Sequence, residues 1–206
     1  MTLRSMSIVA AAALVLGAGA AQAAPLELAV NGGFETGTLT GWTLFPSAPG
    51  QITIVSPGAT GTFAAQLANT VETTACVIKN ANIGIGVVVP AEIITISFDA
   101  KGTLANGGVA FAEFFSEIDG GGVSKSVLLG GAPLNINPNT WTHFSFTTSA
   151  GPNVSGGVTL QLTATTGAVI GSVAQVSYDN ASVTVDRAPV PVAPSTWGRI
   201  KAQYHD

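Results

Sequence analysis

Short runs of alternating apolar and polar residues constrain the fold of this chain more than any other feature. In residues 93–101, isoleucine or phenylalanine alternates with threonine, serine or aspartate, and residues 158–164 repeat the pattern with valine and leucine. A period of two places every second side chain on one face, so each run predicts a half-buried strand. Glycine, proline and asparagine separate the runs, and no stretch has helical periodicity.

We expect strands at residues 26–30, 42–45, 51–55, 64–68, 73–79, 93–101, 109–118, 124–129, 141–148, 158–164 and 174–185. So many short strands predict an all-β fold, namely a jelly-roll β-sandwich of two antiparallel sheets.

The charge and cysteine content exclude several classes of protein. Charged residues make up 9% of the 206-residue chain, and the formal net charge is −4. Seven scattered cations cannot form a phosphate-neutralising surface, so a nucleic-acid partner is excluded. The single cysteine, Cys76, excludes a disulfide framework and a thiolate zinc site, and we expect it to be a small buried hydrophobe.

The first 23 residues are typical of a secretory signal peptide. Arg4 precedes an apolar run over residues 8–20, and the run ends in Ala21-Gln22-Ala23, which fits the small-x-small cleavage rule. The run is shorter than the roughly 20 residues that a membrane span requires. We therefore expect a secreted protein, extracellular or periplasmic, with no transmembrane segment in the mature chain.

The mature chain divides into two parts on composition. A β-sandwich domain is expected over residues 24–187. Residues 188–206 contain prolines at positions 189, 191 and 194 and are too short to fold alone. They predict a Pro-rich linker and a disordered tail.

Two acidic residues lie in apolar surroundings near opposite ends of the mature chain. Glu35 follows the turn Asn31-Gly32-Gly33-Phe34, and Asp179 interrupts the apolar pattern of the last strand. Such acids are costly near a core unless something neutralises them, and a hard cation with oxygen ligands would do so. Alternatively, Glu35 accepts backbone N–H groups at the turn, and Asp179 pairs with Lys101 or Lys79.

One predicted strand offers a face suited to sugars. Phe111, Glu113 and Phe115 fall on the same side of residues 109–118, and we expect His143 and Gln161 on neighbouring strands of that face. Sugar recognition combines aromatic stacking with a few planar polar groups. Alternatively, Phe111 and Phe115 belong to the core and the carboxylates mark a frayed strand end.

The order of several motifs resembles the carbohydrate-binding modules of families four, nine and twenty-two, which belong to the galactose-binding-like jelly rolls. The motifs are the opening Asn-Gly-Gly-Phe-Glu at residues 31–35 with its later Gly41-Trp42, the strand residues 95–102, the strand residues 141–147, and the closing Tyr-Asp-Asn-Ala-Ser-Val at residues 178–183. The resemblance implies a polysaccharide or glycan partner. It also implies a structural calcium held in part by Glu35 and Asp179, although Asn180 stands where the family commonly has a second aspartate.

Enzymatic activity is not expected. Glu113 and Glu117 are four residues apart on one strand, about 13 Å, which exceeds the separation of paired glycosidase carboxylates. Nucleophile-elbow, zinc-protease and phosphate-loop motifs are missing from the sequence.

The C-terminal prolines resemble the start of a PEP-CTERM sorting signal, but its glutamate, apolar helix and arginine cluster are missing. The chain therefore resembles an exported protein of that type without its anchor. We expect a secreted, non-catalytic carbohydrate-binding protein that attaches to extracellular or cell-surface polysaccharide. The alternative is a structural surface or biofilm-matrix protein that uses the same sandwich without a working sugar site. Oligomeric state is not predicted.

Overall fold

A computed structural model describes residues 24–46 and 51–186. These described residues belong to one compact unit. The predicted signal peptide and the predicted Pro-rich tail lie outside the described residues.

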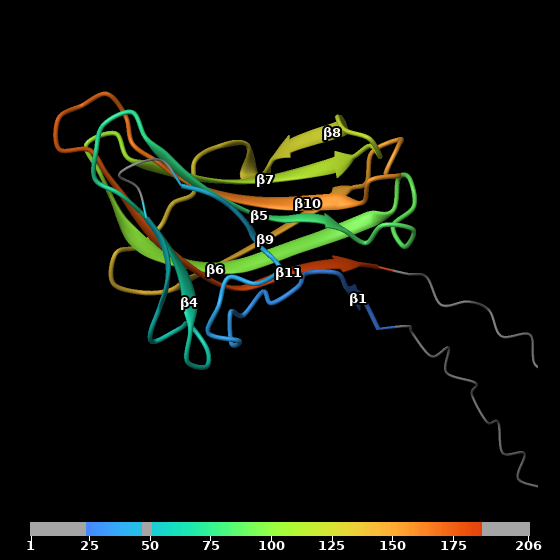
Figure 1. Ribbon diagram of the computed structural model, residues 1–206, viewed down its shortest axis with the longest axis horizontal. Coiled ribbons are helices and arrows are strands. Elements are labelled where there is room, and N and C mark those ends of the chain that lie inside the picture. The colour runs from blue at the N-terminus through green and yellow to red at the C-terminus, as the bar shows by residue number, and fades with distance from the viewer. Residues whose placement is uncertain (1–23, 47–50, 187–206) are drawn as a thin grey trace, which may run out of the picture. The chain divides into compact units, whose positions relative to one another are not determined.

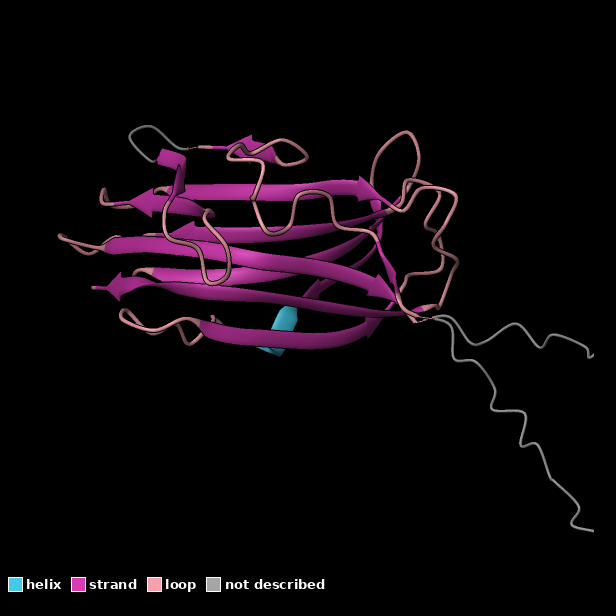
Figure 2. Ribbon diagram, turned by 90° about the horizontal axis from the view of Figure 1, so that it is seen from below, coloured by secondary structure: helices cyan, strands magenta, loops and turns pink. Residues whose placement is uncertain are grey.

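The described residues form two antiparallel sheets that pack face to face (Figures 1 and 2). In chain order the strands are β1 (Leu26–Glu27), β2 (Thr43–Phe45), β3 (Gln51–Val55), β4 (Ala64–Asn69), β5 (Ala75–Ile83), β6 (Ile93–Ala105), β7 (Val109–Glu117), β8 (Val123–Leu128), β9 (Thr142–Ser149), β10 (Val158–Thr165) and β11 (Val173–Val185). A short 3-10 helix, η1 (Leu129–Gly131), follows β8.

The six-stranded sheet has the order β3-β4-β11-β6-β9, with β1 pairing β11, and the five-stranded sheet has the order β2-β5-β10-β7-β8. This arrangement confirms the predicted all-β jelly-roll sandwich. Every predicted strand is present, with shifted ends: β6 continues to Ala105, and β1 keeps only two of its five expected residues.

The core lies between the inner faces of the two sheets. Along β6 the side chains of Ile94, Ile96 and Phe98 are fully buried, as the alternation predicted. The ring of Phe98 lies 5.9 Å from the ring of Tyr178 on β11. The Tyr178 hydroxyl donates a 3.1 Å hydrogen bond to the carbonyl of Thr163 on β10, so one buried side chain links the two sheets. Cys76 is buried, as expected.

The segment before β2 is fixed to the sandwich by a buried amide. Asn80 on β5 accepts a 3.0 Å bond from the Val30 N–H and donates to the carbonyls of Val30 and Gly41 at 2.9 and 3.0 Å. Glycine is required at position 32, because a Cβ there would lie 1.7 Å from the Ala181 carbonyl oxygen. The opening turn is thereby held against β11.

Candidate functional site

The outer face of the five-stranded sheet brings together four of the five predicted sugar-binding residues. Phe111, Glu113 and Phe115 are half-buried on β7, whereas the alternating Ala110, Ala112 and Phe114 are fully buried in the core. The interpretation of Phe111 and Phe115 as core residues is therefore wrong. Gln161 lies opposite Glu113 on β10, and its amide donates a 2.5 Å hydrogen bond to the Glu113 carboxylate.

A lysine and two aromatic rings form the centre of this face. Lys79 on β5 lies in register with Gln161, and its Nζ is 5.3 Å from the centroid of the Phe115 ring. The same Nζ is 5.5 Å from the ring of Phe45 on β2, which is 49% exposed. Cation–π attraction between the ammonium and the two rings holds all three side chains in place.

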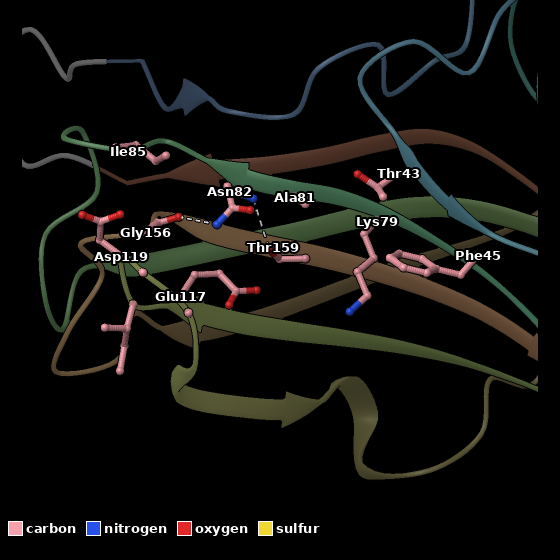
Figure 3. Close-up of a pocket in the computed structure, with 13 residues that line it drawn as sticks. Thr43, Phe45, Lys79, Ala81, Asn82, Ile85, Glu117, Asp119, Gly156 and Thr159 are labelled. Atoms are coloured by element: carbon pink, nitrogen blue, oxygen red, sulfur yellow. Dashed lines mark hydrogen bonds between the residues drawn. The ribbon is translucent and has the colours of Figure 1, made fainter.

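A groove of about 560 Å³ continues from these side chains toward the β7–β8 turn (Figure 3). Thr43, Phe45 and Lys79 line one end, and Glu117 and Asp119 line the other. The groove therefore offers an aromatic ring, a cation, hydroxyls and carboxylates along one concave surface.

His143 does not share this face, contrary to the prediction. It lies on β9 at the edge of the six-stranded sheet, and its Nδ1 is 2.8 Å from a carboxylate oxygen of Asp99 on β6. Alternation along a strand shows which side chains face outward but not which sheet the strand joins, so the histidine was placed on the wrong side of the sandwich. Asp99 thus lies in the six-stranded sheet, whereas Glu113 lies in the five-stranded sheet.

Lys79 and Phe45 are functional candidates that the sequence analysis did not select. Both lie in predicted strands, but register alone brings the lysine between rings from two other strands. The available signal was that position 79 carries the only charged side chain of its alternating run, residues 75–81.

The two predicted metal-binding acids converge on the loop between β3 and β4. The Glu35 carboxylate accepts backbone N–H bonds from Thr62 and Phe63, with distances of 3.0–3.1 Å. The Asp179 carboxylate accepts the N–H of Ala59 at 2.7 Å and that of Thr60 at 3.2 Å. The opening loop and the last strand of the sandwich therefore meet here, as the jelly-roll arrangement requires.

Asp179 is fully buried where the register of β11 against β6 shifts. Burial raises the pKa of its carboxyl, the negative charge of Glu35 raises it further, and the backbone N–H groups of Thr60, Asn180 and Ala59 oppose the rise. No lysine forms an ion pair with Asp179 within the described part of the chain, which removes the pairing with Lys101 or Lys79. Backbone capping by Glu35 is present, although at the β3–β4 loop rather than at its own turn.

The oxygen atoms of these acids and of their neighbour Asn180 are of the type that binds a hard cation. Two carboxylates and the Asn180 amide oxygen lie together, and glycine at position 61 lets the loop approach, since a Cβ there would be 2.5 Å from a Glu35 oxygen. The described residues gather no group of three or more His, Cys, Asp or Glu side chains, so further ligands would be backbone or amide oxygens.

No protein-family profile matches this sequence, and no curated protein matches it. The similarity to known proteins lies in structure. The family 22 xylan-binding module of Xyn10C from Paenibacillus barcinonensis has a TM-score of 0.52 and 16% identity, over 79% of this chain and 94% of the module. The C-terminal family 22 module of Xyn10B from Clostridium thermocellum has a TM-score of 0.53 and 12% identity, over 80% and 96%.

Part of an enzyme domain is also similar in structure. The enzymatically active domain of tailspike protein 4 from bacteriophage CBA120 has a TM-score of 0.61 and 14% identity over 77% of this chain, which spans only 21% of that domain. At such identities the likeness concerns the fold alone. The chain thus has the jelly-roll fold of carbohydrate-binding modules.

Membrane-spanning helices were also sought in the described ranges, and none has the necessary length and apolar character.

Proposed function

We propose that this protein is a secreted, non-catalytic carbohydrate-binding protein whose five-stranded sheet binds a neutral polysaccharide on its outer face. The observation that carries the proposal is the strip formed by Phe45, Lys79 and Phe115, which opens into the 560 Å³ groove. Structural likeness to xylan-binding modules supports xylan as the first candidate ligand.

The chemistry of the strip suits a pyranose chain. The ring of Phe115, and that of Phe111 beside the strip on the same face of β7, offer apolar surface to the C–H face of a sugar. The hydrogen-bonded Gln161 and Glu113 present planar groups that donate to and accept from hydroxyls. Lys79 adds a donor held by two rings, so little side-chain freedom is lost on binding.

We further propose that calcium binds at Glu35 and Asp179. When bound, the ion would neutralise two acids that lie in the same cluster, one of them buried. Support comes from the proximity of the two carboxylates and from the burial of Asp179, which raises the pKa of its carboxyl.

Binding to xylohexaose and to insoluble xylan tests the sugar proposal. Phe115→Ala and Lys79→Gln should each weaken binding about tenfold, which corresponds to 1.4 kcal/mol. The matched control is Thr147→Ala, an exposed position on β9 of the other sheet, which should bind as the unaltered protein does.

Full affinity for xylan in both Phe115→Ala and Lys79→Gln would contradict the proposed sugar-binding face. Failure of the unaltered protein to bind any glycan, together with self-assembly or adhesion, would instead favour the structural surface or biofilm-matrix protein. Glu117 and Asp119 both line the groove, so the same incubations should be assayed for released sugars. The appearance of released sugars would contradict the proposal that the protein is non-catalytic.

A further inference from the structure

A second polar pocket lies on the opposite side of the sandwich, on the outer face of the six-stranded sheet. It has a volume of about 180 Å³ and is lined in part by Gln66, Lys101, Thr103, Pro138, Gln175 and Ser177. This pocket and the groove on the five-stranded sheet share none of their lining residues. Any ligand that it takes therefore binds independently of the proposed sugar face.

Strand register places the polar side chains of the pocket next to one another. Lys101 on β6 lies opposite Ser177 on β11, which in turn lies opposite Gln66 on β4. Gln175 lies opposite Thr103 one step further along the same two strands. Residues that pair across antiparallel strands share a face, so two amides, two hydroxyls and one ammonium converge on one spot.

The charge of the pocket is positive. Its lining contains the ammonium of Lys101 and no carboxylate. Within residues 24–46 and 51–186, no carboxylate lies within ion-pair distance of Lys101. Asp99 lies two residues before Lys101, but its carboxylate is held by His143 at 2.8 Å and by the Asn180 amide at 2.7 Å.

An aromatic ring borders the ammonium. Lys101 Nζ lies 4.9 Å from the centroid of the Trp141 ring, just before β9, and the tryptophan is only partly buried. The pocket thus presents planar amides, hydroxyls and one positive charge beside an aromatic ring, and the Gln66 amide donates a 3.3 Å hydrogen bond to the Ser177 hydroxyl within it. A simple inorganic anion would use the charge and leave the Gln175 amide and the ring without a contact to the ligand.

We propose that this pocket binds a sugar ring that carries a carboxylate, that is, a uronic-acid residue of an acidic polysaccharide. The carboxylate accepts from Lys101, the ring hydroxyls exchange hydrogen bonds with Gln66, Gln175 and Ser177, and the sugar borders Trp141. The five-stranded face discriminates in the other direction, since Glu117 and Asp119 in its groove repel an anion. One sandwich would then connect a neutral glycan to an acidic one.

Titration of the protein with trigalacturonic acid, followed by calorimetry and by the indole N–H signals in a ¹H–¹⁵N spectrum, tests the proposal. Trp141→Phe assigns the Trp141 signal, which should shift on titration. Lys101→Gln should weaken binding about tenfold or more, because it removes a charge-assisted hydrogen bond. Gln175→Ala should weaken it less, and sodium acetate or phosphate alone should not compete at equal concentration.

Lys79→Gln is the matched control, since it removes one outward lysine beside an aromatic ring from the other face. It should leave trigalacturonate binding unchanged while weakening xylohexaose binding, and Lys101→Gln should do the reverse. If Lys101→Gln and Lys79→Gln lost equal affinity for trigalacturonate, the loss would come from the change in net charge alone, and the proposed pocket would be wrong. A trigalacturonate titration that leaves the Trp141 signal unmoved would also overturn the pocket, whatever the xylohexaose result.

Discussion

At the scale of single residues, Asp179 shows how the sandwich tolerates an acid in its interior. Its carboxylate receives three backbone N–H groups, from Ala59, Thr60 and Asn180, and these oppose the cost of burial without cancelling it. The pKa therefore remains above its ordinary value. A buried acid of this kind makes stability depend on pH.

In metal-free buffer, Asp179 should make the protein more stable in mild acid than at neutral pH. The folded chain holds this proton more tightly than the unfolded chain, whose aspartate pKa is about 3.9. The stabilisation that the protonated Asp179 gives to the fold is complete below the aspartate pKa of the unfolded chain. It is lost as pH rises through the Asp179 pKa of the folded chain. Thermal melts of the unaltered protein and of Asp179→Asn, from pH about 7 to about 4, measure this as a rise in the Tm of the unaltered protein relative to that of the variant. A Tm of the unaltered protein that stays level or falls relative to the variant on acidification would contradict it.

Only some residues of the proposed sugar-binding face could be predicted from the sequence. The outward orientation of Phe111, Phe115 and Gln161 followed from alternation. The role of Lys79 did not, because its two ring contacts come from β2 and β7, which are far apart in sequence. Contacts of that kind depend on strand order, which local patterns do not encode.

At the scale of elements, all strands were predictable because short apolar or alternating runs stand between turn residues. The assignment of strands to sheets was not, since both sheets have the same pattern and the chain passes repeatedly from one to the other. His143 on β9 was misplaced for this reason. The meeting of Glu35 and Asp179 was predictable because it follows from the pairing of the first and last strands.

Strand β5 stabilises the segment before β2 through the single side chain of Asn80. Asn80→Ala would leave the Val30 N–H and the carbonyls of Val30 and Gly41 without their partner, in a part-buried setting. We expect a loss of about 3 kcal/mol or more in the free energy of unfolding, measured by urea denaturation. Asn139→Ala, at an exposed loop position, should stay within about 0.5 kcal/mol of the unaltered protein. Equal effects of the two substitutions would show that the amide contributes nothing specific.

At the scale of the whole molecule, the two outer faces of the sandwich differ in charge although the net charge is small. The groove of the five-stranded sheet contains two carboxylates and one lysine, whereas the pocket of the six-stranded sheet contains one lysine and no acid. Because the core occupies only the inner faces, both outer faces can change without loss of the fold. Two ligands of different charge are thus compatible with one small domain.

If calcium binds as proposed, the unfolding of the whole domain should depend on the ion. The reason is that Glu35 lies near the start of the fold and Asp179 lies in its last strand. A ligand that binds only the folded state stabilises it by about 2.7 kcal/mol at a hundred times its Kd. For a domain of this size that corresponds to a rise in Tm of about 5–10 °C. Melts in chelator and in excess calcium measure it.

Glu35→Gln should abolish the calcium-dependent rise, since it removes one of the two charges, whereas Asp119→Asn, in the exposed β7–β8 turn, should retain it. Magnesium should not replace calcium, because it requires a tighter octahedral set of oxygens than a flexible loop supplies. Identical melting in chelator and in calcium would mean that the backbone N–H groups of the β3–β4 loop are the only partners these two carboxylates need.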